Sequence, residues 1–149
     1  MFELKVACLY EANLLVAESW PTRIVSLTGD VDVQHNTPIP HLHVQVNDVG
    51  HAAHWALRPT PEHLQTVLQF TEDLTDEDRL LVHCFAGQSR STAIAIGILL
   101  QHGMDHQQAF EHVASIRDIL LPNTLFIQHI DDYFGLHNKL VEHVANHHR

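Results

Sequence analysis

The sequence predicts an α/β fold in which a central, mostly parallel sheet is flanked by helices. In the first half of the chain, short apolar runs of strand length alternate with segments of helical periodicity, and turn residues mark the joints between them. The second half is dominated by helical patterns. Since ligands of such folds bind beyond the carboxyl ends of the strands, we expect a functional site directly after a central strand.

Four strands are expected up to His83, with a short helix after the first of them and a longer one before the last. The strands are predicted at Lys5–Tyr10, Arg23–Leu27, Leu42–Val46 and Arg79–His83, and the short helix over Glu11–Glu18. A polar loop is expected from Asn47 to Pro59. The last of the four strands is short, apolar and bounded as a central strand would be, so the residues that follow it are the candidates for a site.

Helix starts are predicted from capping signals. Thr60-Pro61-Glu62 begins a helix, because threonine caps, proline suits the first helical position and the acid suits the positive end of the helix dipole. A segment from Ser91 is apolar on every side, which predicts a helix that is buried all round and ends at Gly103.

Two further helical regions are expected near the C-terminus. Asp105 and Gln108 have the spacing of a capping box and precede an apolar segment with helical periodicity. Pro122 and Asn123 open the last helical region, which Gly135 is expected to interrupt.

Length and composition predict one globular domain over residues 1–149. The formal net charge is −10, from 18 acidic against 8 basic residues, and no lysine or arginine cluster stands out. Nucleic acid and anionic membrane are therefore poor partners for this chain, because both need a basic face.

The N-terminal residues and the cysteines indicate a cytoplasmic protein. The first ten residues carry an acid at Glu3 and have no signal-peptide pattern, and no apolar run reaches membrane-spanning length. The two cysteines, Cys8 and Cys84, do not form a disulfide framework.

No cofactor or metal is expected, despite 15 histidines. His143 and His147 would share a face of a helix, but the histidines are spread along the whole chain and lack a companion cluster of Cys or Asp ligands. Their expected effect is on net charge, which becomes less negative below about pH 6.5.

The loop between Cys84 and Arg90 carries the chemistry that the sequence predicts. Six residues, from Phe85 to Arg90, connect a buried strand to a buried helix, and Gly87 supplies the freedom for the sharp turn. If the loop's N–H groups point inward, they form an anion-binding nest beside the positive end of the helix dipole. The guanidinium of Arg90 can hold two phosphate oxygens at once.

A cysteine in such a field is expected to be a thiolate. Inward N–H groups, the helix end and Arg90 favour the charged form, which makes Cys84 a nucleophile able to attack phosphorus. The hydroxyl of Ser91 is placed to donate to the sulfur. A small buried apolar side chain is the ordinary role of a free cysteine; this fits Cys8, predicted within a strand, but does not account for the residues gathered around Cys84.

The segment His83-Cys84-Phe85-Ala86-Gly87-Gln88-Ser89-Arg90-Ser91 matches the HCxxGxxRS signature, so the chain resembles the cysteine-dependent protein tyrosine phosphatases and dual-specificity phosphatases. Pro122-Asn123, with Phe126 and Gln128, is similar to a second stretch of the small dual-specificity phosphatases. The resemblance covers nearly the whole chain and implies a protein tyrosine phosphatase-like fold.

What the resemblance implies is the two-step hydrolysis of a phosphate monoester through a phosphocysteine at Cys84. Arg90 and the N–H groups of Phe85, Ala86, Gly87, Gln88, Ser89 and Arg90 would bind the phosphoryl oxygens, with Ser91 assisting the sulfur. His83 would support the loop. Asp48, the best match to the family's acid, would protonate the leaving oxygen, although Asn47-Asp48-Val49-Gly50 is also a good turn sequence.

Phosphorylated protein or an aryl phosphate is the expected substrate, with phosphotyrosine and phosphoserine or phosphothreonine both open. Trp55 and Arg58 are interpreted as a packing residue and a solvated charge, although they could also line the pocket entrance. Two alternative functions stay open: a phosphoprotein-binding module without hydrolysis, and a thiolate-based arsenate reductase or sulfurtransferase. Cys8 is the only second cysteine for such redox chemistry.

Overall fold

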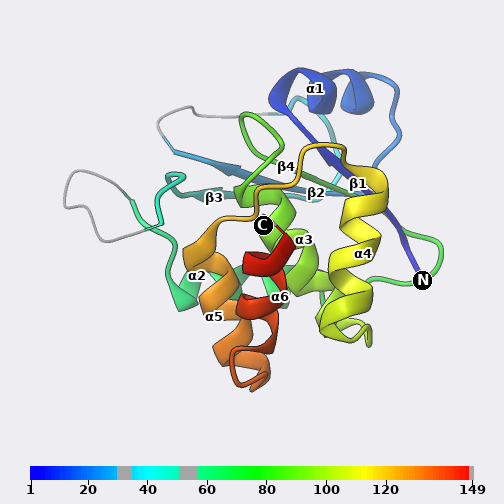
Figure 1. The fold of residues 1–149 in the computed structure, drawn as a ribbon. Helices are drawn as coiled ribbons and strands as arrows, with labels where there is room; N and C mark the ends of the chain where they lie inside the picture. The colour runs from blue at the N-terminus through cyan, green and yellow to red at the C-terminus, as the bar shows by residue number, and fades with distance from the viewer. Residues whose placement is uncertain (30–34, 51–56, 148–149) are drawn as a thin grey trace.

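A computed structural model describes residues 1–29, 35–50 and 57–147 of the chain (Figure 1). Trp55 and part of the predicted polar loop lie outside these ranges. Within the described ranges, no helix is both long and apolar enough to cross a membrane.

The sheet has four strands in the order β1-β4-β2-β3, and each neighbouring pair is parallel. The strands are β1 (Glu3–Ala7), β2 (Arg23–Thr28), β3 (His41–Gln45) and β4 (Arg79–His83). The strand before Cys84 is therefore flanked on both sides, as the sequence predicts for a central strand. Because all strands run the same way, their carboxyl ends meet at one edge of the sheet, where Cys84 follows β4.

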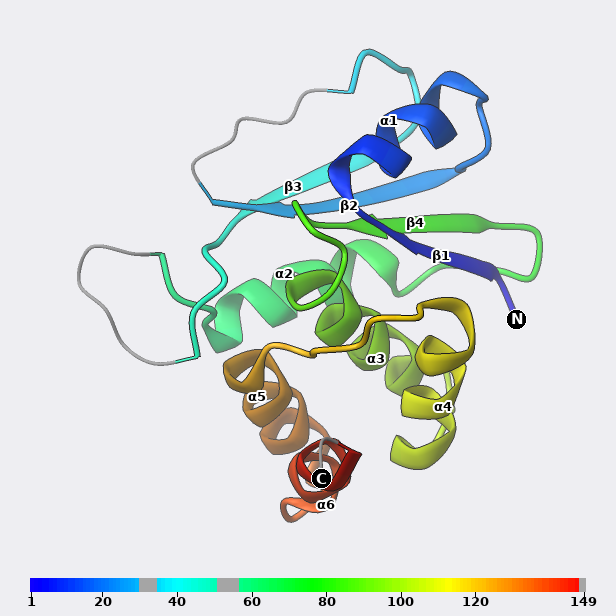
Figure 2. The same cartoon turned by 45° about the horizontal axis from the view of Figure 1, so that its top comes forward.

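Helices cover both faces of the sheet, but unequally. Among the described residues, helix α1 (Leu9–Ala17) lies alone over one face, and five helices lie on the opposite side (Figure 2). These are α2 (Pro61–Thr71), α3 (Arg90–Gln101), α4 (His106–Ile116), α5 (Thr124–Phe134) and α6 (Lys139–His147). The predicted α/β architecture is confirmed.

Two apolar clusters hold these layers together. Under α1, Ala12 packs with Ala7, Ile24 and Leu81 in a small cluster. On the opposite face, α3 is enclosed by the sheet, α2, α4 and α5, and its residues from Ser91 to Leu99 are all buried. The all-round apolar pattern of this segment correctly predicts its burial.

The predicted helix boundaries hold where a side chain caps the helix. Thr60 accepts a hydrogen bond from the amide of His63 at the start of α2, and Asp105 does the same for Gln108 at the start of α4. Gly135 ends α5 in the left-handed conformation, with a φ of 64°.

The prediction for β1 is wrong at its C-terminal end, and with it the prediction for Cys8. The strand ends at Ala7, and Cys8 is the half-exposed N-cap of α1. Its Sγ accepts from the amide of Glu11 at 3.5 Å, and the Glu11 carboxylate accepts from the Cys8 amide at 3.0 Å. This reciprocal capping ends the strand earlier than the apolar run Ala7-Cys8-Leu9-Tyr10 indicates.

Candidate active site

Cys84 lies at the carboxyl end of β4, and α3 begins six residues later at Arg90. Its side chain is almost fully buried, at 1% exposure. The Ser91 hydroxyl lies 3.1 Å from Sγ, and the Gly87 amide donates to Sγ at 3.1 Å. Cys84 is the first residue of the loop, and its thiol therefore lies at the bottom of the hollow that the loop surrounds.

Every carbonyl oxygen from Cys84 to Ser89 has a partner outside the loop. The contacts are His83 Nδ1 to Cys84 O at 3.4 Å, Leu9 N to Phe85 O at 3.0 Å, Arg117 Nη2 to Ala86 O at 3.3 Å, Arg117 Nε to Gly87 O at 2.8 Å, Leu121 N to Gln88 O at 2.9 Å and Asn123 N to Ser89 O at 3.0 Å. The partners come from four places: the end of β4, the start of α1, the end of α4 and the segment before α5.

These contacts determine where the amide N–H groups of the loop point. In a trans peptide the C=O of one residue is antiparallel to the N–H of the next, and the described chain has no cis peptide. Six carbonyls held outward therefore turn the N–H groups of residues 85–90 the opposite way, toward the hollow above the sulfur. This arrangement has the geometry of an anion-binding nest.

Gly87 is required in this loop for two separate reasons. Its φ of 72° lies in the left-handed region, which disfavours residues with a Cβ. A Cβ at this position would also lie 2.6 Å from the backbone carbon of Ala7 and from the backbone nitrogen of Cys8. The loop thus packs directly against the junction between β1 and α1.

Opposing effects act on the pKa of Cys84, and their net result lowers it. Burial raises the pKa, whereas hydrogen bonds from the side chain and backbone of Ser91, the positive charge of Arg90 and the Gly87 amide lower it. Ser89, the N-cap of α3, makes no side-chain capping bond, so the positive end of the α3 dipole stays available to an anion.

The guanidinium of Arg90 is anchored by the chain that follows β3. Its Nη1 donates to the carbonyl of Val46 at 2.8 Å. This single backbone contact fixes the arginine beside the loop and links it to the segment that carries Asp48.

Asp48 lies on the rim of the loop, 36 residues before Cys84 in the chain. Its Oδ1 accepts from the Ser89 hydroxyl at 2.7 Å and from Asn123 Nδ2 at 2.9 Å. Asn123 also caps α5 through the amide of Phe126. The structure thus places Asp48 beside the loop residues, and it brings the Pro122-Asn123 stretch to the same place.

The comparisons with known proteins agree with this geometry. The family model described as "Dual specificity phosphatase, catalytic domain" matches residues 16–135. The chain belongs to the dual-specificity phosphatase family.

Curated relatives of this dual-specificity phosphatase are similar over part of their length. Dual specificity protein phosphatase 1 of Arabidopsis thaliana is 46% identical over 36% of this chain and 27% of its own length. A probable rhodanese domain-containing dual specificity protein phosphatase of Dictyostelium discoideum is 30% identical over 75% of this chain. That match covers 23% of the Dictyostelium protein, so this chain matches about a quarter of either relative.

The fold is also that of solved phosphatase domains. The crystal structure of the Yvh1 phosphatase domain from Chaetomium thermophilum superposes with a TM-score of 0.65 over 94% of this chain and 95% of that chain, at 21% identity. The protein tyrosine phosphatase-like architecture expected from the resemblance is therefore confirmed.

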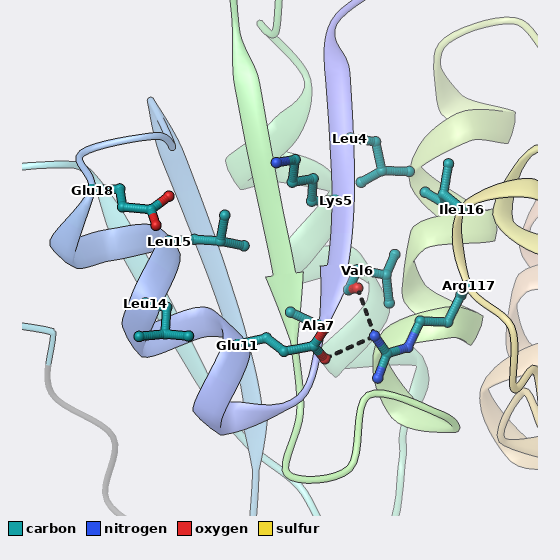
Figure 3. Close-up of a pocket in the computed structure, with 10 residues that line it drawn as sticks. All are labelled: Leu4, Lys5, Val6, Ala7, Glu11, Leu14, Leu15, Glu18, Ile116 and Arg117. Atoms are coloured by element: carbon teal, nitrogen blue, oxygen red, sulfur yellow. Dashed lines mark hydrogen bonds and ion pairs between the residues drawn. The ribbon is translucent and has the colours of Figure 1, made fainter.

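Arg117 contacts the loop but was not predicted from the sequence. It follows α4 and donates to the loop carbonyls of Ala86 and Gly87. Its Nη1 also pairs with Glu11 at 2.8 Å and lies 3.5 Å from the carbonyl of Val6 (Figure 3). No motif marks it; the one available signal is an isolated arginine just after a helix, which is common on protein surfaces.

A groove beside β1 lies next to Arg117 but is separate from the sulfur. Residues of α1, β1 and the end of α4 line it, including Glu11, Leu15 and Ile116 (Figure 3). It contains no nucleophile of the loop, so we place the candidate active site at Cys84 and not in this groove.

No metal centre is found in the described part of the chain. No group of three or more His, Cys, Asp or Glu side chains there is arranged to hold an ion. His143 and His147 do share a face of α6, and both rings pack edge-on against Phe110, with ring centroids 4.9 and 4.8 Å away.

Proposed function

We propose that this chain hydrolyses phosphate monoesters on proteins, through a phosphocysteine formed at Cys84. The observation that carries the proposal is the set of six loop carbonyls held outward, which leaves six N–H groups and Arg90 around one buried sulfur. Such a site stabilises both the thiolate and the negative charge that shifts among the phosphoryl oxygens during transfer. We propose residues 1–149 as one catalytic domain.

In the first step, the Cys84 thiolate attacks phosphorus while the bond from phosphorus to the leaving oxygen breaks. The N–H groups of residues 85–90 and the guanidinium of Arg90 bind the three non-bridging oxygens. Asp48, at the rim of the loop, gives its proton to the leaving oxygen, so the alcohol or phenol departs neutral. To do so, Asp48 exchanges its contacts with Ser89 and Asn123 for the substrate.

In the second step, water replaces the sulfur on phosphorus. Asp48, now ionised, takes a proton from the attacking water, and the bond between sulfur and phosphorus breaks. The Ser91 hydroxyl, 3.1 Å from Sγ, donates to the departing thiolate. Inorganic phosphate leaves, and the thiolate is restored without a metal or cofactor.

Phosphotyrosine is the first substrate class that we propose, and phosphoserine and phosphothreonine are the second. The net charge of −10 disfavours nucleic acid and anionic membranes as partners. The cytoplasm is the proposed location, because a reducing compartment keeps a nucleophilic thiol in its active form.

The test is the release of inorganic phosphate from a phosphotyrosine peptide and a phosphothreonine peptide, in buffer without added metal. We expect catalytic turnover on the phosphotyrosine peptide and none from a Cys84→Ser variant that is folded by circular dichroism. Stoichiometric capture of the peptide with no phosphate released would overturn the proposal in favour of a binding module.

A further inference from the structure

A layer of histidines lies directly under the first residue of the loop, on the face of the sheet that α1 covers in part. Side chains alternate along a strand, so Ser26 and Thr28 of β2 share this face with His83 of β4. His41 and His43 of β3 contact the two hydroxyls from the edge of the sheet. His35, just before β3, completes the layer.

The contacts in this layer are short and converge on His83. Ser26 Oγ lies 2.6 Å from His83 Nε2 and 2.6 Å from His41 Nε2. His35 Nε2 lies 3.0 Å from the same His83 nitrogen. Ser26 and His83 are fully buried, at 0% exposure each, so bulk water does not satisfy these groups.

One arrangement of protons satisfies every contact around His83. Its Nδ1 faces the carbonyl of Cys84 at 3.4 Å and must carry the proton, which leaves Nε2 as an acceptor. The single lone pair of Nε2 then accepts from the Ser26 hydroxyl at 2.6 Å, and His35 Nε2–H is the longer branch of the same three-centre bond, at 3.0 Å. With its proton committed to His83, Ser26 accepts from His41 Nε2–H.

This arrangement matters for the loop because His83 holds the first of the six carbonyls. The 3.4 Å distance between His83 Nδ1 and the Cys84 carbonyl is the longest of the six contacts to the loop carbonyls. This contact is therefore the most sensitive to the orientation of the imidazole ring. Turning the Cys84 carbonyl toward His83 turns the Phe85 N–H the opposite way. A misplaced ring would free this peptide and weaken the nest around the sulfur.

We propose that Ser26 and His41 are positioning residues for the thiolate: they hold His83 in one tautomer and one orientation, and through it they fix the first peptide of the phosphate-binding loop. The inference rests on the proposed function for its consequence in turnover, but not for its effect on the sulfur. The titratable groups facing His83 are His35, His41, His43 and Cys84 itself. Burial, followed by the neighbouring histidines, lowers the pKa of His83 to about 4, so the ring is neutral at pH 7, as the arrangement requires.

Two neighbouring hydroxyls of β2 provide a matched pair of variants. Ser26→Ala deletes the hydroxyl that links His41 to His83, whereas Thr28→Val deletes the hydroxyl that contacts His43 at 2.6 Å, two residues along the same strand. Both positions are buried and both hydroxyls contact a β3 histidine, but the Ser26 hydroxyl contacts His83 as well.

The measurement is the pH dependence of Cys84 alkylation by iodoacetamide, which requires no turnover and therefore separates this proposal from the proposed function. Cys8 is replaced by serine in all variants, so that one thiol reacts. For Ser26→Ala we expect the pKa of Cys84 to rise by about one unit, and the alkylation rate at pH 6 to fall by up to about tenfold. Thr28→Val should follow the parent protein, and Ser26→Thr should restore the parent value.

If the phosphatase activity is present, the acid limb of its kcat/KM profile should move by the same amount in Ser26→Ala, with little change in KM for an aryl phosphate.

If Ser26→Ala does not fold, the half-buried His41 is replaced by leucine instead, with His43→Leu as its control, and a smaller shift of the same sign is expected. Equal Cys84 pKa values in Ser26→Ala and the parent, or an equal shift in Thr28→Val, would overturn the proposal.

Discussion

The phosphate-binding loop and the segment that carries Asp48 lie side by side but are held in different ways. Six loop carbonyls have partners drawn from four parts of the chain, and Gly87 packs against backbone atoms. Asp48 is exposed and is held to the loop through the side chains of Ser89 and Asn123. The loop around the proposed nucleophile is therefore held through its backbone, whereas the side chain of the proposed acid is held by contacts with two other side chains.

This difference suits the two roles. A binding site for developing charge gains most from dipoles that do not reorganise during reaction. An acid that first donates a proton and later accepts one must approach two different oxygens in turn. Variants of the loop and variants of Asp48 should therefore have different effects: the former on binding and stabilisation of the phosphoryl group, the latter on proton transfer.

The largest effect is expected on the acid side. Asp48→Asn keeps the shape of the side chain but removes the proton, so kcat should fall by about 10²–10⁴-fold on a phosphate ester whose leaving group is a poor one. The loss should shrink on an aryl phosphate with a strongly acidic phenol, because that leaving group needs no proton. Comparing kcat for the two substrates checks this.

An Asp48→Asn variant with full turnover on the poor leaving group would remove Asp48 from the mechanism. Alkylation of Cys84 serves as the control for this variant. It should be unchanged, because Asp48 is not among the groups that set the pKa of the thiol.

On the loop side, Gly87→Ala should damage both stability and activity. The new Cβ would occupy a left-handed conformation and lie 2.6 Å from backbone atoms of the β1–α1 junction. We expect the free energy of unfolding to fall by about 2 kcal/mol or more, and kcat/KM to fall by about 10²-fold or more. Chemical denaturation and steady-state kinetics measure the two effects; a fully active, equally stable variant would show that the loop is not rigidly packed.

A smaller effect is expected when one loop partner is removed. Arg117→Gln removes the guanidinium that donates to the carbonyls of Ala86 and Gly87, so kcat/KM should fall by about tenfold. Glu11→Gln is the matched control, since it weakens the ion pair to Arg117 but leaves the contacts to the loop. If the two variants lost activity equally, the ion pair and not the loop contact would be the important feature.

The last expected effect is on stability and not on activity: a pH dependence of the free energy of unfolding that comes from the histidine layer. The pKa values of His41 and His83 are lowered from 6.5 to about 4, chiefly by burial. Between about pH 6.5 and pH 4, these histidines are protonated in the unfolded state but neutral in the folded state. The free energy of unfolding should therefore decrease as the pH falls through this range. The slope is at most about 1.4 kcal/mol per pH unit for each titrating histidine, and it is smaller for the half-buried His41, whose charge is partly screened by solvent.

Denaturant titrations at pH 7, 6 and 5 measure this slope in the parent and in His41→Gln. The variant should show a shallower decrease, because one half-buried imidazole has been removed. A variant whose slope matched that of the parent would indicate that His41 does not stay neutral in the folded state.

The sequence predicts this site unevenly, for physical reasons. Cys84, Gly87 and Arg90 can be recognised because the loop needs those residue types within a short span, and the helix after it is apolar on every side. Arg117 and Leu9 could not be foreseen, because they reach the loop through tertiary contacts with carbonyls, which any residue provides. Apart from His83, the residues of the histidine layer were missed for the same reason: they come from two strands and a loop, and each looks like an isolated polar residue.

The boundary errors have a local cause. The apolar run after Lys5 predicts a strand as far as Tyr10, but Cys8 acts as a helix cap, a role more often taken by Ser, Thr, Asp or Asn. Here the sulfur and the Glu11 carboxylate close a reciprocal cap, which the residue type alone does not indicate.

The ionisation of Cys84 underlies every step proposed above, because outward carbonyls and one guanidinium are expected to keep this sulfur charged. Its alkylation rate between pH 4 and 10 measures that ionisation without any need for turnover. With Cys8 replaced by serine throughout, so that one thiol reacts, we expect a single transition well below the ordinary thiol range, absent in Cys84→Ser. A transition near the ordinary thiol value of about 8.5 would contradict this explanation of the site.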